Sequence, residues 1–242
     1  MGLGYKDEHI EIPCLFFVDD GIILAQREED LVQLIGVLER SAEFCGLKLN
    51  RNKCSILTFN AGENQQIAGI KVEKEFKYLG MLVGNVKGWS GGQINKSHEK
   101  SLKMSNYTYS IIGGSCNRLM VGKTYWKNVA LPGILYGQEI LPYNKGDLLK
   151  MQRVENKTYR TILGLPTYTA ITFLRGEIGS SSFHARDMKS KISYYKYALY
   201  ESNNPMLRVI INREKIERSK WFKKVEYTVG PIRTNKNECY KK

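Results

Sequence analysis

Two short apolar runs flank a pair of aspartates near the start of the chain, and this arrangement restricts the possible folds more than any other feature of the sequence. Residues 14–18 (Cys-Leu-Phe-Phe-Val) precede the tripeptide Asp19-Asp20-Gly21, and residues 22–25 (Ile-Ile-Leu-Ala) follow it. This spacing predicts a β-hairpin. Because successive residues of both arms are apolar, we expect both faces to be covered inside a packed sheet, with the acidic tip exposed.

An amphipathic helix should follow the hairpin. Apolar residues recur at helical spacing across residues 31–42, behind acidic residues 28–30 that suit a helix N-terminus. Gly46 supplies a C-terminal stop for this helix. Residues 53–59 then predict a strand, and residues 67–83 predict two more strand-like pieces.

The character of the chain changes at a glycine-rich stretch, residues 84–92, which has the composition of a joint and places a boundary near residue 95. Helices are predicted beyond it at residues 95–112, 121–130, 146–164 and 182–201, with turns at residues 113–114, 132–133 and 164–166. The fold class is therefore α+β: a small antiparallel sheet with a packed helix, followed by a mainly helical region. We expect three parts, residues 1–95, residues 96–180 and a basic helical region at residues 181–242.

The net charge of +13 favours a polyanionic partner such as nucleic acid. Residues 1–95 carry 10 basic and 13 acidic side chains, residues 96–180 carry 12 and 5, and residues 181–242 carry 15 and 6. The positive charge therefore belongs to the helical region. A surface charge that only keeps the protein soluble is the alternative explanation.

The five cysteines stand at wide, irregular spacing with no C-x-x-C pair, which argues against a zinc site or a disulfide framework. We expect a reducing intracellular compartment, either the nucleus or the cytoplasm. The first 11 residues lack the apolar core of a signal peptide. No apolar run approaches the roughly 20 residues that span a bilayer, so no membrane association is expected.

Asp19 and Asp20 are the residues most suited to chemistry. Two carboxylates at a hairpin tip repel each other unless a cation compensates them. Mg²⁺ takes oxygen ligands and usually binds through one or two carboxylates plus substrate phosphates, which makes both aspartates candidate metal ligands. The alternative is that Asp-Asp-Gly is simply a good tight turn.

Three segments in succession resemble the palm motifs of reverse transcriptases. Residues 17–20 (Phe-Val-Asp-Asp) resemble the family's aromatic-x-Asp-Asp motif. Residues 46–54 resemble the next palm motif, and residues 76–80 (Phe-Lys-Tyr-Leu-Gly) resemble the one after it, the primer grip. Both the order and the spacing agree with the family.

Later segments resemble those that follow the palm in LINE-type elements. They are residues 135–139, 151–155 and 160–166. Over residues 13–200 the chain is thus similar to the C-terminal part of the reverse transcriptase of a non-LTR (LINE-type) retrotransposon. The resemblance implies the rear of a polymerase palm followed by a helical thumb or connection domain.

The resemblance also implies roles for individual residues. Asp19 and Asp20 would be ligands of catalytic Mg²⁺ or Mn²⁺, and Lys53 would protonate the pyrophosphate leaving group. Tyr78, Leu79 and Gly80 would form the primer grip. The alternative for Lys53 is a solvated lysine without a catalytic role. The alternative for Tyr78 and Leu79 is an ordinary role in the core of the sheet. The implied partners are an RNA template, a DNA primer and deoxynucleotides, and the implied chemistry is two-metal nucleotidyl transfer.

The same resemblance implies parts that this sequence does not show. In the family a further aspartate lies on a strand well upstream of the Asp-Asp hairpin, together with the fingers that hold template and nucleotide. Here Asp7 is the one aspartate before Pro13, and it stands in a polar segment with no strand pattern. A palm without its first strands would expose an edge and an apolar face. We therefore expect the chain alone to be inactive or nearly so.

A second hypothesis is a non-catalytic, nucleic-acid-binding remnant of a retroelement. Metal-dependent binding at Asp19 would favour the polymerase, whereas salt-dependent, metal-independent binding would favour the remnant. In either case the basic side chains of the helical region would contact phosphates. The candidates are Lys96, Lys100, Lys103, Lys123, Lys127, Arg218, Lys220, Lys223 and Lys224.

Overall fold

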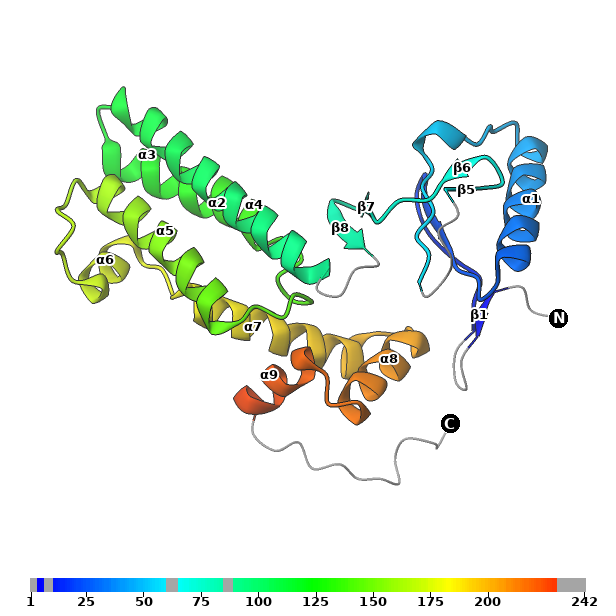
Figure 1. Cartoon of the computed structure of the whole chain (residues 1–242). Coiled ribbons are helices and arrows are strands. Elements are labelled where there is room, and N and C mark those ends of the chain that lie inside the picture. Colours follow the sequence, from blue (N-terminus) through cyan, green and yellow to red (C-terminus); the bar gives the residue numbers. More distant parts are fainter. Residues whose placement is uncertain (1–3, 7–10, 60–64, 85–88, 230–242) are drawn as a thin grey trace. The chain divides into compact units, whose positions relative to one another are not determined.

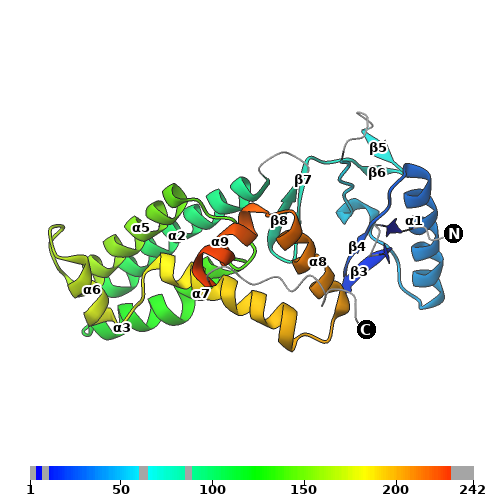
Figure 2. The same cartoon turned by 90° about the horizontal axis from the view of Figure 1, so that it is seen from below.

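The computed structural model describes residues 4–6, 11–59, 65–84 and 89–229 (Figures 1 and 2). The chain divides into two compact units, Met1–Gln93 and Ile94–Lys242. The first contains small antiparallel ladders and one long helix, and the second is helical. The α+β class predicted from the sequence is confirmed.

The first unit, which we call the sheet unit, pairs its strands two by two. The strands are β1 (Tyr5–Lys6), β2 (Glu11–Ile12), β3 (Cys14–Phe17), β4 (Asp20–Ile23), β5 (Gln66–Ile67), β6 (Ile70–Lys71), β7 (Glu75–Tyr78) and β8 (Met81–Gly84). β1 pairs antiparallel with β2, β3 with β4, β5 with β6 and β7 with β8, so the described residues form four separate two-stranded ladders. The strand predicted at residues 53–59 is wrong. Only Ile56 there forms a bridge, parallel to Val72, and the 3-10 turn η1 (Arg51–Lys53) ends at the first residue of the predicted strand.

Helix α1 (Glu28–Phe44) forms where the apolar spacing predicted it. Its first turn carries the acidic residues that favour a helix N-terminus. At its other end, Gly46 adopts a φ of 73°. The Gly46 N–H donates to Glu43 O at 2.9 Å and the Leu47 N–H to Ala42 O at 2.8 Å, which is the pair of bonds of a Schellman motif.

The core of the sheet unit is small. Ile35 of α1 packs with Ile56, Ile67 and Ile70, and partly buried neighbours such as Ile23 complete the cluster. The hairpin of β3 and β4 lies mostly outside it, because Phe16 is 56% and Phe17 61% exposed. The prediction that both faces of this hairpin are covered is therefore wrong for the described chain, since each sheet here has only two strands and no second layer covers β3.

The second unit, which we call the helical unit, contains a series of helices (Figure 1). They are α2 (Trp89–Gly113), α3 (Arg118–Tyr125), the π-helix η2 (Trp126–Ala130), α4 (Leu131–Leu135), α5 (Lys145–Leu163), α6 (Ile171–Ile178), α7 (Phe183–Lys196), the π-helix η3 (Tyr197–Glu201), α8 (Pro205–Ile216) and α9 (Lys220–Val229). Helix α2 starts in the last residues of the sheet unit. The glycines of the predicted joint at residues 91 and 92 are therefore helical, while residues 85–88 lie outside the described part.

One predicted turn is wrong. Residues 132–133 lie inside α4 rather than between helices. The preceding π-helix η2 changes the hydrogen-bond register, and the absent N–H of Pro132 is tolerated in the first turn of the segment that follows. Elsewhere the glycine stops were predicted correctly, since α5 ends at Gly164 with a left-handed φ of 69°.

Aromatic residues dominate the core of the helical unit. Trp126, Tyr143, Tyr159 and Phe183 are among its largest fully buried side chains. Trp126 meets Tyr159 edge to face, with 6.3 Å between ring centroids, and Tyr143 meets Phe183 at 5.8 Å. Such pairs add to the stabilisation from apolar area alone. A second cluster, Tyr195, Ala198, Ile211, Trp221, Phe222 and Val225, joins α7, η3, α8 and α9.

Two ion pairs are buried in the same unit. Glu155 of α5 pairs with Arg186 of α7 and accepts a hydrogen bond from the Tyr159 hydroxyl. Asp187 pairs with Lys191 one turn later, and both side chains are almost fully buried. The Lys191 ammonium also donates to Gln138 O at 3.2 Å and lies 5.6 Å from the ring centroid of Tyr143. Burial lowers the pKa of Lys191 despite the opposing attraction of Asp187.

Candidate functional site

The turn that carries the aspartates is tighter than the sequence indicates. Phe17 pairs with Asp20, so Val18 and Asp19 alone form the turn and Asp20 is the first residue of β4. Val18 has a φ of 57°, a left-handed conformation that is strained for a β-branched residue. Positive φ at only the first central residue is the pattern of a type II′ turn, where glycine is preferred.

Gly21 has a role that the turn motif did not reveal. It lies opposite Phe16 in the ladder, and a Cβ added to Gly21 would stand 2.4 Å from Phe16 Cε1. The Phe16 ring therefore rests against the glycine immediately beside Asp20. Sequence reasoning placed Gly21 in the turn, but its absent side chain instead makes room for a cross-strand aromatic ring.

The two aspartates are neighbours at the turn end of one hairpin. Both aspartates are exposed. Among the described residues, no group of three or more His, Cys, Asp or Glu side chains could hold a metal ion. This donor set fits the one or two carboxylates through which Mg²⁺ usually binds when phosphates and water supply its remaining ligands. It does not form a closed metal cage by itself.

Lys53 is the last residue of η1 and is exposed. In the described part of the chain it forms no hydrogen bond or ion pair with Asp19 or Asp20. Its neighbour Arg51 is held firmly: the guanidinium pairs with Glu39 at 2.6 Å and donates to Ala68 O at 3.1 Å. The hydrogen bond from Arg51 lowers the pKa of Glu39. Lys53 therefore extends from a fixed turn, and no side chain or carbonyl group within the described ranges restrains its ammonium.

The segment predicted as a primer grip forms a hairpin turn between β7 and β8. Tyr78 pairs with Met81, and the two turn residues, Leu79 and Gly80, have φ values of 46° and 81°. Positive φ at both positions is the pattern of a type I′ turn. The Leu82 N–H donates to Gln93 Oε1 at 2.9 Å, which ties this hairpin to the start of α2. Its use as a primer grip stays a prediction.

Three of the predicted phosphate-binding lysines share one face of α2. Lys96, Lys100 and Lys103 follow helical spacing and are all exposed. The opposite face is buried through small hydroxyl side chains, for example Ser105, which accepts a hydrogen bond from Thr158 of α5 at 2.8 Å. Small residues allow α2 to lie close to α5. The three exposed lysines therefore project from a helix that is packed against a neighbouring helix.

Lys123 and Lys127 have a structural contact. Lys123 donates to Glu177 O at 3.2 Å and Lys127 to Gly179 O at 2.8 Å, so both cap the C-terminal end of α6. Cations stabilise that end of a helix because its carbonyl groups lack partners. Their predicted contact with phosphate is untested and would have to coexist with these bonds.

The basic residues of the tail differ in exposure. Arg218 pairs with Glu226 at 3.4 Å, and Lys220 and Lys223 are exposed. Lys224 is half-buried, and burial lowers its pKa. The Trp221 indole, which follows Lys220 in the chain, is buried and donates to Glu139 O. Trp221 is therefore a packing residue of α9.

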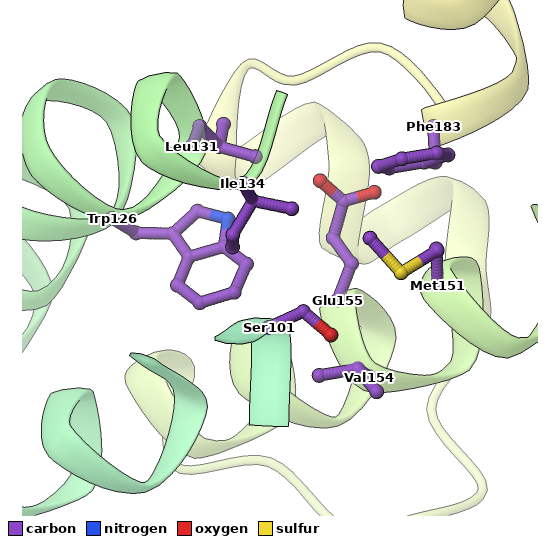
Figure 3. A pocket seen from close by; sticks show the side chains of 8 residues that line it. All are labelled: Ser101, Trp126, Leu131, Ile134, Met151, Val154, Glu155 and Phe183. Atoms are coloured by element: carbon purple, nitrogen blue, oxygen red, sulfur yellow. The ribbon is translucent and has the colours of Figure 1, made fainter. Parts of the chain in front are cut away.

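A small cavity lies in the core of the helical unit, and Figure 3 shows its lining. It is lined by Ser101, Trp126, Leu131, Ile134, Met151, Val154, Glu155 and Phe183. Its volume of about 10 Å³ is roughly that needed by a single water molecule. The cavity is therefore too small for a nucleotide. No helix in the described part of the chain is long and apolar enough to cross a membrane.

Comparison with known proteins supports the resemblance of the sheet unit to reverse transcriptases. A family model described as reverse transcriptase (RNA-dependent DNA polymerase) matches residues 4–83, which include the β3–β4 hairpin and all but the last residue of the β7–β8 hairpin. The chain is also 24% identical over 264 residues to a retrovirus-related Pol polyprotein from the type-1 retrotransposable element R2 of Nasonia vitripennis. These findings support a non-LTR reverse transcriptase and confirm the resemblance carried by the motifs.

The extent of the similarity is uneven. It covers 90% of this chain but 23% of the R2 polyprotein, so the chain spans about a quarter of the length of the curated relative it matches. No solved structure matches the chain. The sheet unit thus has a family match, whereas the helical unit is described by its own geometry and by the R2 similarity.

Proposed function

We propose that this chain is part of an RNA-directed DNA polymerase of a non-LTR retroelement and that Asp19 and Asp20 belong to its catalytic centre. The observation that carries the proposal is the coincidence of two features in residues 4–83. The reverse transcriptase family matches there, and the Phe-Val-Asp-Asp segment forms a tight hairpin that holds two carboxylates in solvent. A turn with only a structural role would not require a valine in the strained left-handed conformation before the aspartates.

The described residues suggest how the site would work. Asp19 in the turn and Asp20 at the start of β4 would be ligands for Mg²⁺ or Mn²⁺, which in reverse transcriptases would stabilise charge on the attacking and leaving oxygens. Lys53 would donate a proton to the leaving pyrophosphate, and its unrestrained ammonium suits that role. The Leu79–Gly80 turn, with Tyr78 beside it, would position the end of a DNA primer.

The helical unit would hold the template–primer duplex as a thumb. The exposed lysines of α2 offer phosphate contacts along one helix face, and Lys220 and Lys223 offer others on α9. Such contacts give affinity without sequence reading and weaken as salt rises.

We also infer that residues 1–242 do not extend a primer by themselves. The described carboxylates at the candidate centre come from a single hairpin, whereas two metals need ligands from more than one element. The exposed Phe16 and Phe17 support the same inference, because a working centre would place these rings against further protein.

Mn²⁺ binding tests the role of the aspartates without requiring turnover. Titration of the full chain, followed by electron paramagnetic resonance, should show Mn²⁺ binding that weakens at least tenfold in Asp19→Asn and in Asp20→Asn. A Glu28→Gln, Glu29→Gln variant is the matched control, because it removes two adjacent exposed carboxylates at the start of α1. Equal binding in all variants would favour the non-catalytic remnant.

Primer extension on an RNA template then tests activity. With Mg²⁺ or Mn²⁺ we expect no product from the full chain. Extension that disappears in both Asp19→Ala and Asp20→Ala would support the polymerase and overturn the inferred inactivity. Extension that survives both substitutions would contradict the assignment of the catalytic centre.

A further inference from the structure

Two stretches of the helical unit contain no acidic residue. There is no aspartate or glutamate between Glu99 and Glu139, and none between Glu155 and Glu177. The same stretches contain eight lysines and arginines: Lys100, Lys103, Arg118, Lys123, Lys127, Lys157, Arg160 and Arg175. Solvated helix surfaces usually mix both signs of charge, so stretches of this length without acidic residues require an explanation.

The fold brings parts of these stretches together. Helix α5 packs against both α3 and α6, and Figures 1 and 2 show α6 beside the C-terminal end of α5. Arg118, the first residue of α3, donates from Nε to Thr161 O near the end of α5 at 2.9 Å. We call this region the acid-free end. It consists of the start of α3, the last two turns of α5, residues 164–170 and the start of α6.

The cations at the acid-free end are positioned but not neutralised. Arg118 is held by the Thr161 carbonyl, and Arg160 donates from Nη2 to Thr169 O at 3.1 Å. Neither of them, nor Lys157, forms an ion pair in the part of the chain that the structure describes. Carbonyl groups fix the directions of Arg118 and Arg160, and the charges of the exposed Arg118 and Lys157 stay available to an anion. Less conformational entropy would then be lost when a phosphate binds.

An exposed aromatic ring lies next to the residue that Arg160 contacts, because Tyr168 precedes Thr169 in the chain. Tyr168 is 88% exposed and belongs to the connection from α5 to α6. The connection is well ordered by its own hydrogen bonds: Gly164 ends α5, the Thr169 N–H donates to Pro166 O at 3.2 Å, and the Thr169 hydroxyl donates to the same oxygen at 2.8 Å. Arg160 fixes the far side through Thr169 O. A rigid loop thus holds a large apolar ring in water.

We propose that the acid-free end binds single-stranded nucleic acid, with Tyr168 stacking on an unpaired base and Lys157, Arg118 and Arg160 facing the phosphates. Aromatic rings combined with a cationic surface are how sequence-independent single-strand binding is achieved, because every base offers a face for stacking. A duplex would use the charge but not the ring, since its bases are already stacked. This inference goes beyond the proposed polymerase function and does not require catalysis by the sheet unit.

The test compares two ligands with the full-length chain. Fluorescence anisotropy would measure binding of a labelled oligo(dT) single strand and of a blunt DNA duplex of equal length. Tyr168→Ala should weaken single-strand binding about tenfold and duplex binding less than twofold. Tyr168→Phe, which keeps the stacking face, should bind the single strand like the wild type.

Matched variants separate this site from general surface charge. Tyr200→Ala removes an exposed tyrosine beside Glu201 and should leave single-strand binding unchanged. Lys157→Gln should lower the slope of log affinity against log salt by about 0.7, whereas Lys150→Gln, at the other end of α5, should not. Circular dichroism would confirm that each variant is folded.

Two outcomes would overturn the proposal. The first is wild-type single-strand affinity in folded Tyr168→Ala. The second is an equal loss for single strand and duplex, which would indicate charge without stacking. Single-strand binding is measured without metal or nucleotide. If the polymerase proposal fails, this assay still tests the role of Tyr168, and if Tyr168 has no role, the polymerase proposal can still be tested.

Discussion

The two units of this chain show opposite relations between motif and burial. The sheet unit carries the motifs that resemble those of a polymerase, yet its core is a cluster around four isoleucines, and Phe16 and Phe17 of the β3–β4 hairpin are exposed. The helical unit carries weaker motifs but buries tryptophan, tyrosine and two ion pairs. The residues that resemble functional motifs therefore lie in the sheet unit, which has the smaller core of buried side chains.

The largest expected effect tests the strength of the helical unit. Asp187→Ala leaves the Lys191 ammonium buried without its carboxylate, so it should lower the free energy of unfolding by about 3–5 kcal/mol. Glu217→Ala is the matched control: it also breaks an i,i+4 pair, with Arg213, but this pair is exposed and contributes about 0.3–0.5 kcal/mol. Urea titration followed by circular dichroism would measure both.

A double variant separates two explanations for such a loss. Asp187→Leu with Lys191→Met removes both charges, and most of the lost stability should return. If Asp187→Ala and Glu217→Ala instead lowered the free energy of unfolding by similar amounts, the Asp187–Lys191 pair would not be deeply buried. It would then no longer support the contrast between a deeply buried helical unit and a shallow sheet unit.

The same contrast explains what the sequence could and could not predict. The spacing of leucine, isoleucine and glycine predicted α1 and the end of α5 because these signals are local. The hairpin at Phe17 and Asp20 was predicted for the same reason, but its burial was not, because burial depends on neighbouring strands that the described chain does not supply.

For the candidate site, the two aspartates and the Leu79–Gly80 turn could be proposed from motifs, whereas Gly21 and Tyr168 could not. The role of Gly21 depends on its cross-strand partner Phe16, and the role proposed for Tyr168 depends on Arg160 of α5, which donates to the neighbouring Thr169 carbonyl. One signal was present in the sequence: the absence of acidic residues around Arg118 and Arg160.

Alkaline pH should weaken the helical unit by a smaller amount. Burial raises the pKa of Tyr143 to about 12, from an ordinary value of 10. Between these values the folded protein holds a proton that the unfolded chain releases, so the stability due to Tyr143 is complete below pH 10 and is lost as pH rises toward 12. One such group contributes at most about 1.4 kcal/mol per pH unit.

Tyr143→Phe isolates this contribution from that of other titrating groups. The unfolding free energy of the variant should fall less steeply than that of the wild type between pH 10 and pH 12. Urea titration at several pH values would measure the two slopes. Identical slopes would mean that the Tyr143 hydroxyl is not as deeply buried as the structure describes, and the contrast between the units would be weaker.

The smallest expected effect concerns the strained turn of the sheet unit. Val18 adopts a φ of 57° next to the candidate metal ligands, which costs on the order of 1 kcal/mol for a β-branched residue. Val18→Gly removes that strain, although glycine also gives the unfolded chain more freedom. We therefore expect a net gain of about 0.5 kcal/mol in hairpin stability, measured by hydrogen exchange of the amides in β3 and β4.

Leu79→Gly supplies the comparison within the same unit, because Leu79 also has a positive φ, but is not β-branched. Leu79→Gly should stabilise the β7–β8 hairpin by less than Val18→Gly stabilises the β3–β4 hairpin. If Val18→Gly stabilises the hairpin but weakens Mn²⁺ binding, the strained turn holds Asp19 in a direction that a relaxed turn does not keep. A stabilised hairpin with unchanged Mn²⁺ affinity would instead mean that Val18 is strained for reasons unconnected with the metal, and the aspartates alone would define the site.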